Sequence, residues 1–229
     1  DVSDAFSIVG KPAAFEYKYD GFRVNIHKKN DNVKIFTRRL EDVTTQFPDI
    51  VEFVKSNIKS NEIICEGEAV GYEPITKKYV PFQSISQRIR RKYDIDEISQ
   101  KFPVEVNLFD VIYHEGKNLI NTAYKKRREI LQNSVNQEDK KIVLAKQIIT
   151  DNIDIAQEFY DQSIKSGEEG VMAKNLESVY KPGSRVGYGV KIKSIMEPLD
   201  LVIVGAEYGE GKRSGFLSSF ILAISDNGE

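Results

Sequence analysis

The chain has 229 residues, of which 40% are hydrophobic and 30% charged, enough for one large domain or for one domain and part of another. Its net charge of −2 does not indicate a nucleic-acid binder as a whole, so any surface for nucleic acid must be local. The single cysteine excludes a disulfide framework, and without a signal peptide or an apolar run of about 18 residues we expect an intracellular protein with no membrane partner.

The first informative stretch is an alternating apolar pattern that changes phase at Gly21. Aromatic residues occupy the odd positions before this glycine, and apolar residues occupy the even positions after it. The pattern predicts two strands, 15–19 and 22–28, joined by a turn or bulge, with Lys18 and Arg23 facing one cavity. Placing the Lys18 ammonium between carboxylates and aromatic residues costs free energy unless the group has a function. For so short a pattern, however, an ion pair between Lys18 and its acidic neighbours is the commoner outcome.

The rest of the chain alternates strands with dispersed helices. Proline at position 48 and Ser84 are expected to start two of the helices, and Gly167 to follow the end of another. We expect strands over 33–37, 62–70, 79–82, 104–113, 142–145, 170–174, 189–193 and 220–224, and helices over 48–58, 84–92, 123–135 and 152–165. Hairpin turns favour antiparallel pairing, so the predicted class is α+β, with antiparallel sheets flanked by helices.

A new segment begins after Pro198, so we expect one domain over residues 1–198 and the first part of a second over 199–229. The first residue is not methionine, and a turn signal, Asp-Asn-Gly, follows the last predicted strand directly. Both features favour an excised piece of a longer protein over natural termini.

Lys18 is the candidate nucleophile. A lysine forms covalent nitrogen–phosphorus or nitrogen–carbon intermediates when its pKa is lowered. Adjacent carboxylates raise that pKa, so cations from elsewhere in the chain would have to lower it. The candidate cations are Arg23, Arg38, Arg185, Lys191 and Lys193.

Three glutamates are candidate metal ligands. Glu66 and Glu68 lie on the same face of an otherwise apolar predicted strand, and Glu169 precedes another strand. Carboxylates at such positions suit Mg²⁺, which binds one or two of them together with substrate phosphates, although most glutamates of this kind simply face solvent. The sequence contains neither a Cys/His cluster for zinc nor a P-loop or Rossmann glycine motif.

Two basic runs could contact nucleic acid. The run 87–92 lacks glutamate partners four residues on, and following a phosphate backbone is as reasonable a reading as a solvated surface. In the run 125–128 an ordinary core stripe and a following glutamate favour a solvated helix face.

Six short motifs in order resemble those of the nucleotidyltransferase (adenylation) domain of ATP-dependent DNA ligases, most closely the archaeal type. They are E-Y-K-Y-D-G-F-R (16–23), F-T-R-R-L-E-D (36–42), E-G-E-A-V (66–70), N-L-F-D-V-I-Y (107–113), E-E-G-V-M-A-K (168–174) and V-K-I-K (190–193). One such motif is weak evidence, but six in the right order are strong, and together they favour a catalytic Lys18. The resemblance implies an ATP-grasp-like nucleotidyltransferase fold, followed from residue 199 by the start of an OB-fold.

The resemblance also implies a role for each matching residue. Lys18 would attack the α-phosphate of ATP and hold AMP, which would pass to the 5′-phosphate of a DNA nick before the 3′-hydroxyl seals it. Glu16 would read the adenine amino group, and Phe109 would stack on the base. The remaining implied contacts are Arg23 and Arg38 to the ribose and phosphates, Glu68 to ribose or metal, Glu169 to Mg²⁺ or Mn²⁺, and Arg185, Lys191 and Lys193 to the phosphates.

The implied setting is a monomeric, cytoplasmic enzyme of DNA replication, repair and recombination, with nicked double-stranded DNA as its partner and a sliding clamp as a further partner through regions outside this sequence. One departure is Gly189, which stands where many ligases have tryptophan. The alternatives are an mRNA capping guanylyltransferase or RNA ligase of the same superfamily, and a non-catalytic nucleotide-binding scaffold.

Overall fold

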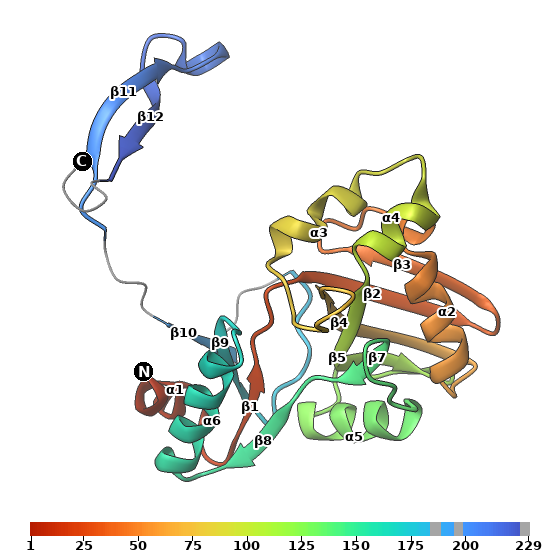
Figure 1. Cartoon of the computed structure of the whole chain (residues 1–229). Coiled ribbons are helices and arrows are strands. Elements are labelled where there is room, and N and C mark those ends of the chain that lie inside the picture. The colour runs from red at the N-terminus through yellow and green to blue at the C-terminus, as the bar shows by residue number, and fades with distance from the viewer. Residues whose placement is uncertain (184–188, 195–198, 225–229) are drawn as a thin grey trace. The chain divides into compact units, whose positions relative to one another are not determined.

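The computed structural model describes residues 1–183, 189–194 and 199–224 (Figure 1). The chain divides into two compact units, residues 1–194 and 195–229. The larger unit contains two separate β-sheets with helices packed against each, so the predicted α+β class is confirmed.

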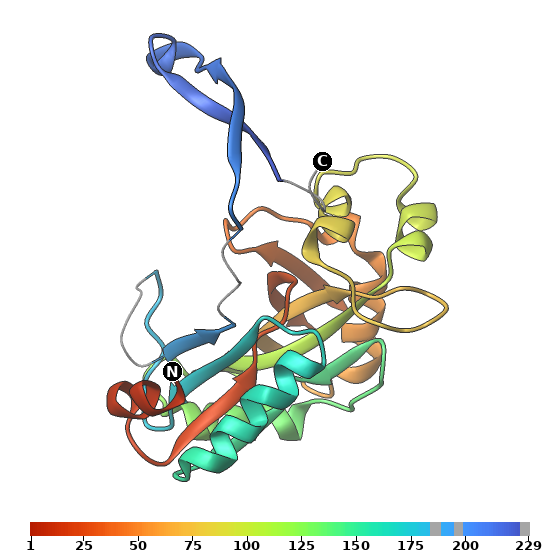
Figure 2. The same cartoon turned by 60° about the vertical axis from the view of Figure 1, so that its left-hand side comes forward.

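The first sheet has four antiparallel strands in the order β10-β9-β1-β8. These strands are β1 (Ala13–Tyr17), β8 (Gln147–Thr150), β9 (Gly170–Asn175) and β10 (Gly189–Lys193). Helices α1 (Val2–Val9) and α6 (Ile153–Lys165) lie beside it (Figures 1 and 2). Its core gathers Phe6, Phe15, Ala156 and Phe159 from these elements. Helix α1 and strand β8 were not predicted, although the buried residues of α1, Val2, Ala5, Phe6 and Val9, follow helical spacing after the N-cap Asp1.

The second sheet follows the order β3-β2-β4-β5-β6, and β7 adds to β5 in parallel. Its strands are β2 (Phe22–Lys29), β3 (Asn32–Thr37), β4 (Glu62–Gly71), β5 (Val104–His114), β6 (Lys117–Asn118) and β7 (Ile142–Leu144). The elements beside it are the 3₁₀ turn η1 (Thr44–Gln46), α2 (Pro48–Asn57), α3 (Phe82–Ile89), α4 (Ile95–Lys101) and α5 (Tyr124–Ser134). Fully buried aliphatic residues of β2, β4 and β5 build a second core.

The change of phase at Gly21 marks the place where the chain crosses from one sheet to the other. Strands β1 and β2 belong to different sheets, and the aromatic residues before the glycine enter one core while the apolar residues after it enter the other. A side chain at Gly21 would place its Cβ 2.3 Å from the carbonyl oxygen of Ala69 on β4. Glycine is therefore required for the close approach that lets the crossing happen within a few residues.

Two local predictions around α3 are wrong. Residues 79–82 form no strand, because Tyr79 makes only an isolated bridge with Tyr72 and the helix already begins at Phe82. Ser84 lies inside that helix, whose N-cap is Pro81, and its side chain does not cap it. The helix buries Ile85 and Arg88, and burying these two residues fixes which helix face packs on the protein. Ser84 therefore lies within the first turn and not at the N-cap position.

The smaller unit is described from residue 199 to 224. It is an antiparallel hairpin of β11 (Val202–Tyr208) and β12 (Leu217–Ala223), with the 3₁₀ turn η2 (Gly211–Arg213) between them. Strand β12 overlaps the strand predicted over 220–224, with shifted ends, and β11 lies in the segment that begins after Pro198. None of the described helices in either unit has the length and apolar character needed to cross a membrane.

Candidate active site

Lys18 lies directly after β1 and remains attached to β9 through its backbone. Its N–H donates to the carbonyl oxygen of Gly170 at 2.8 Å, and its own carbonyl accepts from the N–H of Glu169 at 3.0 Å. The Lys18 ammonium forms an ion pair with the Glu169 carboxylate, which also binds Lys193 Nζ of β10 at 2.5 Å. Lys18 and Lys193, which were predicted from two separate motifs, thus meet at the carboxylate of Glu169, which was predicted from a third.

Gly170 allows the close backbone approach on which this arrangement depends. Its φ of +135° is open to glycine only, and a Cβ there would lie 2.0 Å from the carbonyl oxygen of Ile192. Strands β9 and β10 can therefore approach closely beside Glu169. Burial pushes the pKa of Glu169 upward, but the hydrogen bonds and charges of Lys18 and Lys193 outweigh it and hold the pKa below its usual value.

Glu68 of β4 belongs to the same electrostatic neighbourhood. Burial raises its pKa to about 7, against the opposing charges of Lys18 and Arg23, while Glu169 adds to the rise. Within the described part of the chain, no three His, Cys, Asp or Glu side chains gather as a metal-binding group. Glu68 and Glu169 are the two carboxylates of this neighbourhood that the sequence analysis named as candidate metal ligands.

Arg23 of β2 is held by Glu66, which the sequence analysis considered only as a candidate metal ligand, and by Tyr180, which it did not assign to the site. Its Nη2 lies 2.5 Å from Glu66 Oε2 and 3.3 Å from the hydroxyl of Tyr180, and that hydroxyl donates to Glu66 Oε1 at 2.8 Å. Glu66 was quoted within the motif 66–70, and its burial at 3% exposure distinguishes it from a solvent-facing glutamate. Nothing in the sequence near Tyr180 indicates this contact, because its partners lie more than 100 residues away.

A β-bulge places Phe109 toward this site. In the pairing of β4 with β5, Glu66 faces Asp110 and Gly67 faces Leu108, so Phe109 is left as the extra residue. Such a bulge redirects one side chain out of the alternation. The ring centre of Phe109 lies 5.8 Å from the Arg23 guanidinium carbon and 4.8 Å from Lys174 Nζ.

Glu16 of β1 is 2% exposed and densely bonded. Its carboxylate pairs with Lys174 of β9, accepts hydrogen bonds from the Tyr124 hydroxyl and from Gln147 Nε2 at 2.8 Å, and lies 3.6 Å from Arg128. Burial alone would raise its pKa, but the charges of Lys174 and Arg128 lower it. These four partners were not predicted as site residues.

The prediction of a solvated face for residues 125–128 is right for the two lysines and wrong for the two arginines. Arg127 forms a two-pronged ion pair with Asp110, at 2.8 and 3.0 Å, and Arg128 donates to the backbone carbonyls of Leu108 and Ala145. Both arginines are buried because α5 packs directly on β5. They satisfy backbone and acidic groups behind Phe109, so they support the site without facing solvent.

A groove of about 880 Å³ adjoins Arg23 on the side of α3. Its basic members are Arg23, Arg38, Arg39, Arg90 and Lys92, and its acidic members are Glu41 and Asp42. Arg38 and Arg39 are exposed. The basic run 87–92 therefore contributes part of its charge to this groove, and its contact with a phosphate backbone stays a prediction.

Arg88 is the exception in that run. It is fully buried, donates to both carboxylate oxygens of Asp49 at 2.9 and 2.7 Å, and stacks 4.4 Å from the ring centre of Phe47. It also donates to Ser99 Oγ at 2.9 Å and to the carbonyl oxygen of Phe102 at 2.9 Å. Arg88 thus ties α3 to α2 and α4 and is a structural residue.

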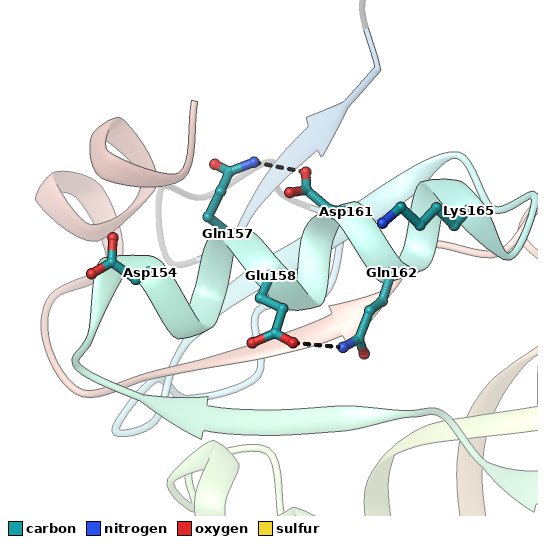
Figure 3. Close-up of a pocket in the computed structure, with 6 residues that line it drawn as sticks. All are labelled: Asp154, Gln157, Glu158, Asp161, Gln162 and Lys165. Carbon is teal, nitrogen blue, oxygen red and sulfur yellow. Dashed lines mark hydrogen bonds between the residues drawn. The ribbon is translucent and has the colours of Figure 1, made fainter.

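A second hollow lies along the outer face of α6 (Figure 3). Gln157 donates to Asp161 at 2.9 Å and Gln162 donates to Glu158 at 3.3 Å, one helical turn apart in each case. These are ordinary pairs on a solvated helix, and no predicted site residue lines this hollow.

Two predicted residues are not part of these contacts or cannot be placed. Lys191 of β10 is exposed, and Arg185 lies outside the described residues. The structure brings the other predicted residues into three groups. Lys18, Glu68, Glu169 and Lys193 form the first, Arg23 with Phe109 and with Arg38, which lines the same groove, the second, and Glu16 with its partners the third.

Comparisons with known proteins identify the family of the chain. The family model described as "ATP dependent DNA ligase domain" matches residues 1–193. The chain is 53% identical to a DNA ligase of Nanoarchaeum equitans over 99% of its own length, and 48% identical to a DNA ligase of Thermococcus onnurineus over 98%. It spans about 40% of the length of each of these curated relatives.

Solved structures of DNA ligases have a fold similar to that of this chain. A mycobacterial DNA ligase D complexed with ATP and MES superimposes with a TM-score of 0.63 at 26% identity, over 96% of this chain and 65% of that one. The ATP-dependent DNA ligase from bacteriophage T7, in complex with ATP, gives a TM-score of 0.57 over 100% of this chain and 75% of that one. At 18% identity the second comparison shows the fold alone.

Proposed function

Because this chain belongs to the ATP-dependent DNA ligase family, we propose that it forms lysyl-AMP at Lys18. The Lys18 nitrogen attacks the α-phosphorus of ATP, a nitrogen–phosphorus bond forms, and the bond to the pyrophosphate oxygen breaks. The observation that carries the proposal is that Lys18, Glu169 and Lys193 meet. The nitrogen of Lys18, the proposed nucleophile, lies near a second lysine, Lys193, whose positive charge can face the transferred phosphate. Phosphoryl transfer depends mainly on the positioning of the reacting groups and on positive charge around the transferred phosphate.

The nucleotide is proposed to lie across the three groups of the site. Phe109 would stack on adenine and Glu16 would accept from its amino group. Arg23 and Arg38 would contact the ribose and phosphate region, and Lys191, Lys193 and Arg185 the phosphates. In support, Arg23 lies beside the Phe109 ring, and both arginines line the same groove.

Glu68 and Glu169 would hold a divalent cation, Mg²⁺ or Mn²⁺, together with phosphate oxygens of ATP; Glu68 would otherwise bind the ribose. The cation would neutralise charge on the phosphates. Two carboxylates without a third ligand fit Mg²⁺, which keeps several waters or substrate oxygens. With a cation bound, Glu169 would release Lys18 from the ion pair seen here.

In the whole protein, AMP would pass to the 5′-phosphate of a nick in double-stranded DNA, and the 3′-hydroxyl would then displace it. The groove lined by Arg38, Arg39, Arg90 and Lys92 supports contact with the sugar–phosphate backbone, since it gathers four cations on exposed elements. Residues 199–229 would be the start of an OB-fold domain after a nucleotidyltransferase domain over 1–198. A cytoplasmic monomer that works with a sliding clamp in replication, repair and recombination is part of the same proposal.

Labelled nucleotides test the proposal. The full-length protein is incubated with Mg²⁺ and either α-labelled ATP or α-labelled GTP, and the labelled protein is measured. We expect label from ATP alone. Label from GTP alone would instead indicate a guanylyltransferase, and no label from either would indicate a non-catalytic scaffold.

A further inference from the structure

Gln147 of β8 has a fixed amide with one unused acceptor. Its Nε2 donates to Glu16 Oε1 at 2.8 Å and lies 2.9 Å from the Tyr124 hydroxyl. A carboxylate oxygen only accepts, so the nitrogen of the amide must be the atom that faces Glu16. The amide oxygen, Oε1, therefore faces the other way, and among the residues that the structure describes it receives no hydrogen bond.

The Gln147 side chain is also the accessible member of its cluster. Glu16 and Tyr124 are each 2% exposed, whereas Gln147 is partly exposed. Glu16 already receives groups on both of its oxygens, Gln147 and Tyr124 on Oε1 and Lys174 on Oε2. A ligand that reaches this cluster finds a free acceptor on Gln147 and at most one accepting position on Glu16.

The cluster borders the ring of Phe109. Lys174 Nζ, the ion-pair partner of Glu16, lies 4.8 Å from the ring centre of Phe109 and 4.8 Å from that of Tyr124. A flat ligand stacked on Phe109 would thus present its edge to an ammonium donor and to amide and carboxylate acceptors. Besides Lys174, the described donors nearby are the Tyr124 hydroxyl, which bonds to both Glu16 and Gln147, and Arg23, which lies 5.8 Å from the centre of that ring.

This pattern distinguishes the two common purines. The edge of adenine carries an amino group at position 6, with two N–H donors, beside an acceptor nitrogen. Guanine carries a carbonyl acceptor at the same position, which would face the Gln147 and Glu16 oxygens without a hydrogen, and a buried mismatch of this kind is strongly disfavoured.

We propose that Gln147 is a specificity-determining residue, whose Oε1 accepts one N–H of the 6-amino group of adenine stacked on Phe109. Glu16 accepts the other N–H and, with Tyr124, holds the Gln147 amide in the required orientation. The inference rests on the proposed function, because it requires a nucleotide at Phe109. The base is thus selected partly from β8, a strand that carries none of the six motifs.

The test compares nucleotides within one variant of the full-length protein. Gln147→Leu, which keeps the size of the side chain but has no acceptor, is assayed for adduct formation with ATP and with purine riboside 5′-triphosphate, which lacks the 6-amino group. Gln157→Leu on the exposed face of α6 is the matched control. Because each ratio is taken within one protein, partial loss of folded material cancels.

In the wild type and the control we expect ATP to be preferred over the analogue in kcat/KM. In Gln147→Leu that preference falls about tenfold, the usual effect of one lost hydrogen bond to a substrate, and almost entirely through the KM for ATP. An equal loss for both nucleotides, or no change in the ratio, overturns the role of Gln147 while lysyl-AMP formation stands. A wild-type protein that forms no adduct with ATP overturns the proposed function itself.

Discussion

At the scale of single residues, the site depends on carboxylates that each serve two cationic or polar partners. Glu169 binds both Lys18 and Lys193, and Glu66 binds both Arg23 and Tyr180. Glu16 pairs with Lys174 and accepts hydrogen bonds from other side chains as well. A buried charge is tolerated only when it is paired and hydrogen-bonded in this way. Removing one partner therefore perturbs the other partner through the shared carboxylate.

Tyr180→Phe tests this sharing. The change removes the hydroxyl that donates to Glu66 Oε1 and contacts Arg23, so Arg23 loses part of its orientation. We expect the KM for ATP in adduct formation to rise by about three- to tenfold, with a smaller effect on kcat. The control is Tyr113→Phe, which removes a hydroxyl bonded to Glu62 at 2.9 Å at the other end of β4. Equal KM values for the two variants would refute the role of Tyr180.

Glu168→Gln tests a buried acid next to the site. Burial raises the pKa of Glu168 from 4.5 to about 7, an effect that Lys146 opposes and that Asp20 reinforces. The folded state therefore binds a proton that the unfolded chain releases, and the free energy of unfolding falls as the pH rises through this window.

Below the unfolded pKa the two proteins should be equally stable, and above pH 7 Glu168→Gln should be more stable by about 1 to 3 kcal/mol. Urea unfolding at pH 4.5 and pH 8 measures this, with Glu158→Gln on the exposed face of α6 as the control. A stability difference that does not depend on pH would contradict the assignment.

At the scale of elements, the crossing from β1 to β2 turns a linear motif into a site. The sequence pattern locates the crossing at Asp20-Gly21, because the alternation changes phase there. It does not reveal that the two strands enter different sheets, since pairing partners such as Ala173 and Gly67 are contributed by distant segments. For the same reason Gln147 and Tyr180 could not be assigned from local pattern, while Lys18 and Glu169 could be assigned from their motifs. Lys174 ends the motif that contains Glu169, but no role was assigned to it.

Arginines illustrate the limit of charge patterns. The runs 87–92 and 125–128 look alike in sequence as basic helix segments, yet Arg88, Arg127 and Arg128 are buried while Arg90 and Lys125 are exposed. A buried arginine can be recognised only when its acceptors are known, and here they are carbonyl oxygens and carboxylates of other elements. Tertiary packing decides between the two environments.

Arg88→Met is expected to lower the free energy of unfolding by about 3 kcal/mol, because Asp49 would be left without its arginine partner. The matched control is Arg91→Met, which breaks an exposed pair with Asp94 and should cost less than about 1 kcal/mol. Equilibrium unfolding in urea distinguishes them. If both variants are equally stable, Arg88 is not the clamp between α3, α2 and α4.

At the scale of the whole molecule, a slightly acidic chain gathers several basic residues in one groove beside the proposed nucleotide site. The net charge of −2 therefore gives no indication of the proposed DNA contact. Cations that face a DNA backbone make binding depend on salt, since each contact releases counterions.

The double variant Arg90→Ala/Lys92→Ala tests the groove in the full-length protein. We expect weaker binding to a nicked duplex and a plot of log affinity against log salt whose slope is smaller by about 2. The double variant Lys125→Ala/Lys126→Ala removes two exposed cations outside the groove and should leave the slope unchanged. Equal effects of the two variants would show that the groove does not follow the backbone.

The covalent adduct itself gives the most direct test of the central claim. The full-length protein is incubated with ATP and Mg²⁺, and its intact mass and the mass of the peptide containing Lys18 are measured. We predict the added mass of AMP on that peptide, and no added mass in Lys18→Ala. An adduct that persists in Lys18→Ala, or a wild-type protein that gains no mass, would contradict the account.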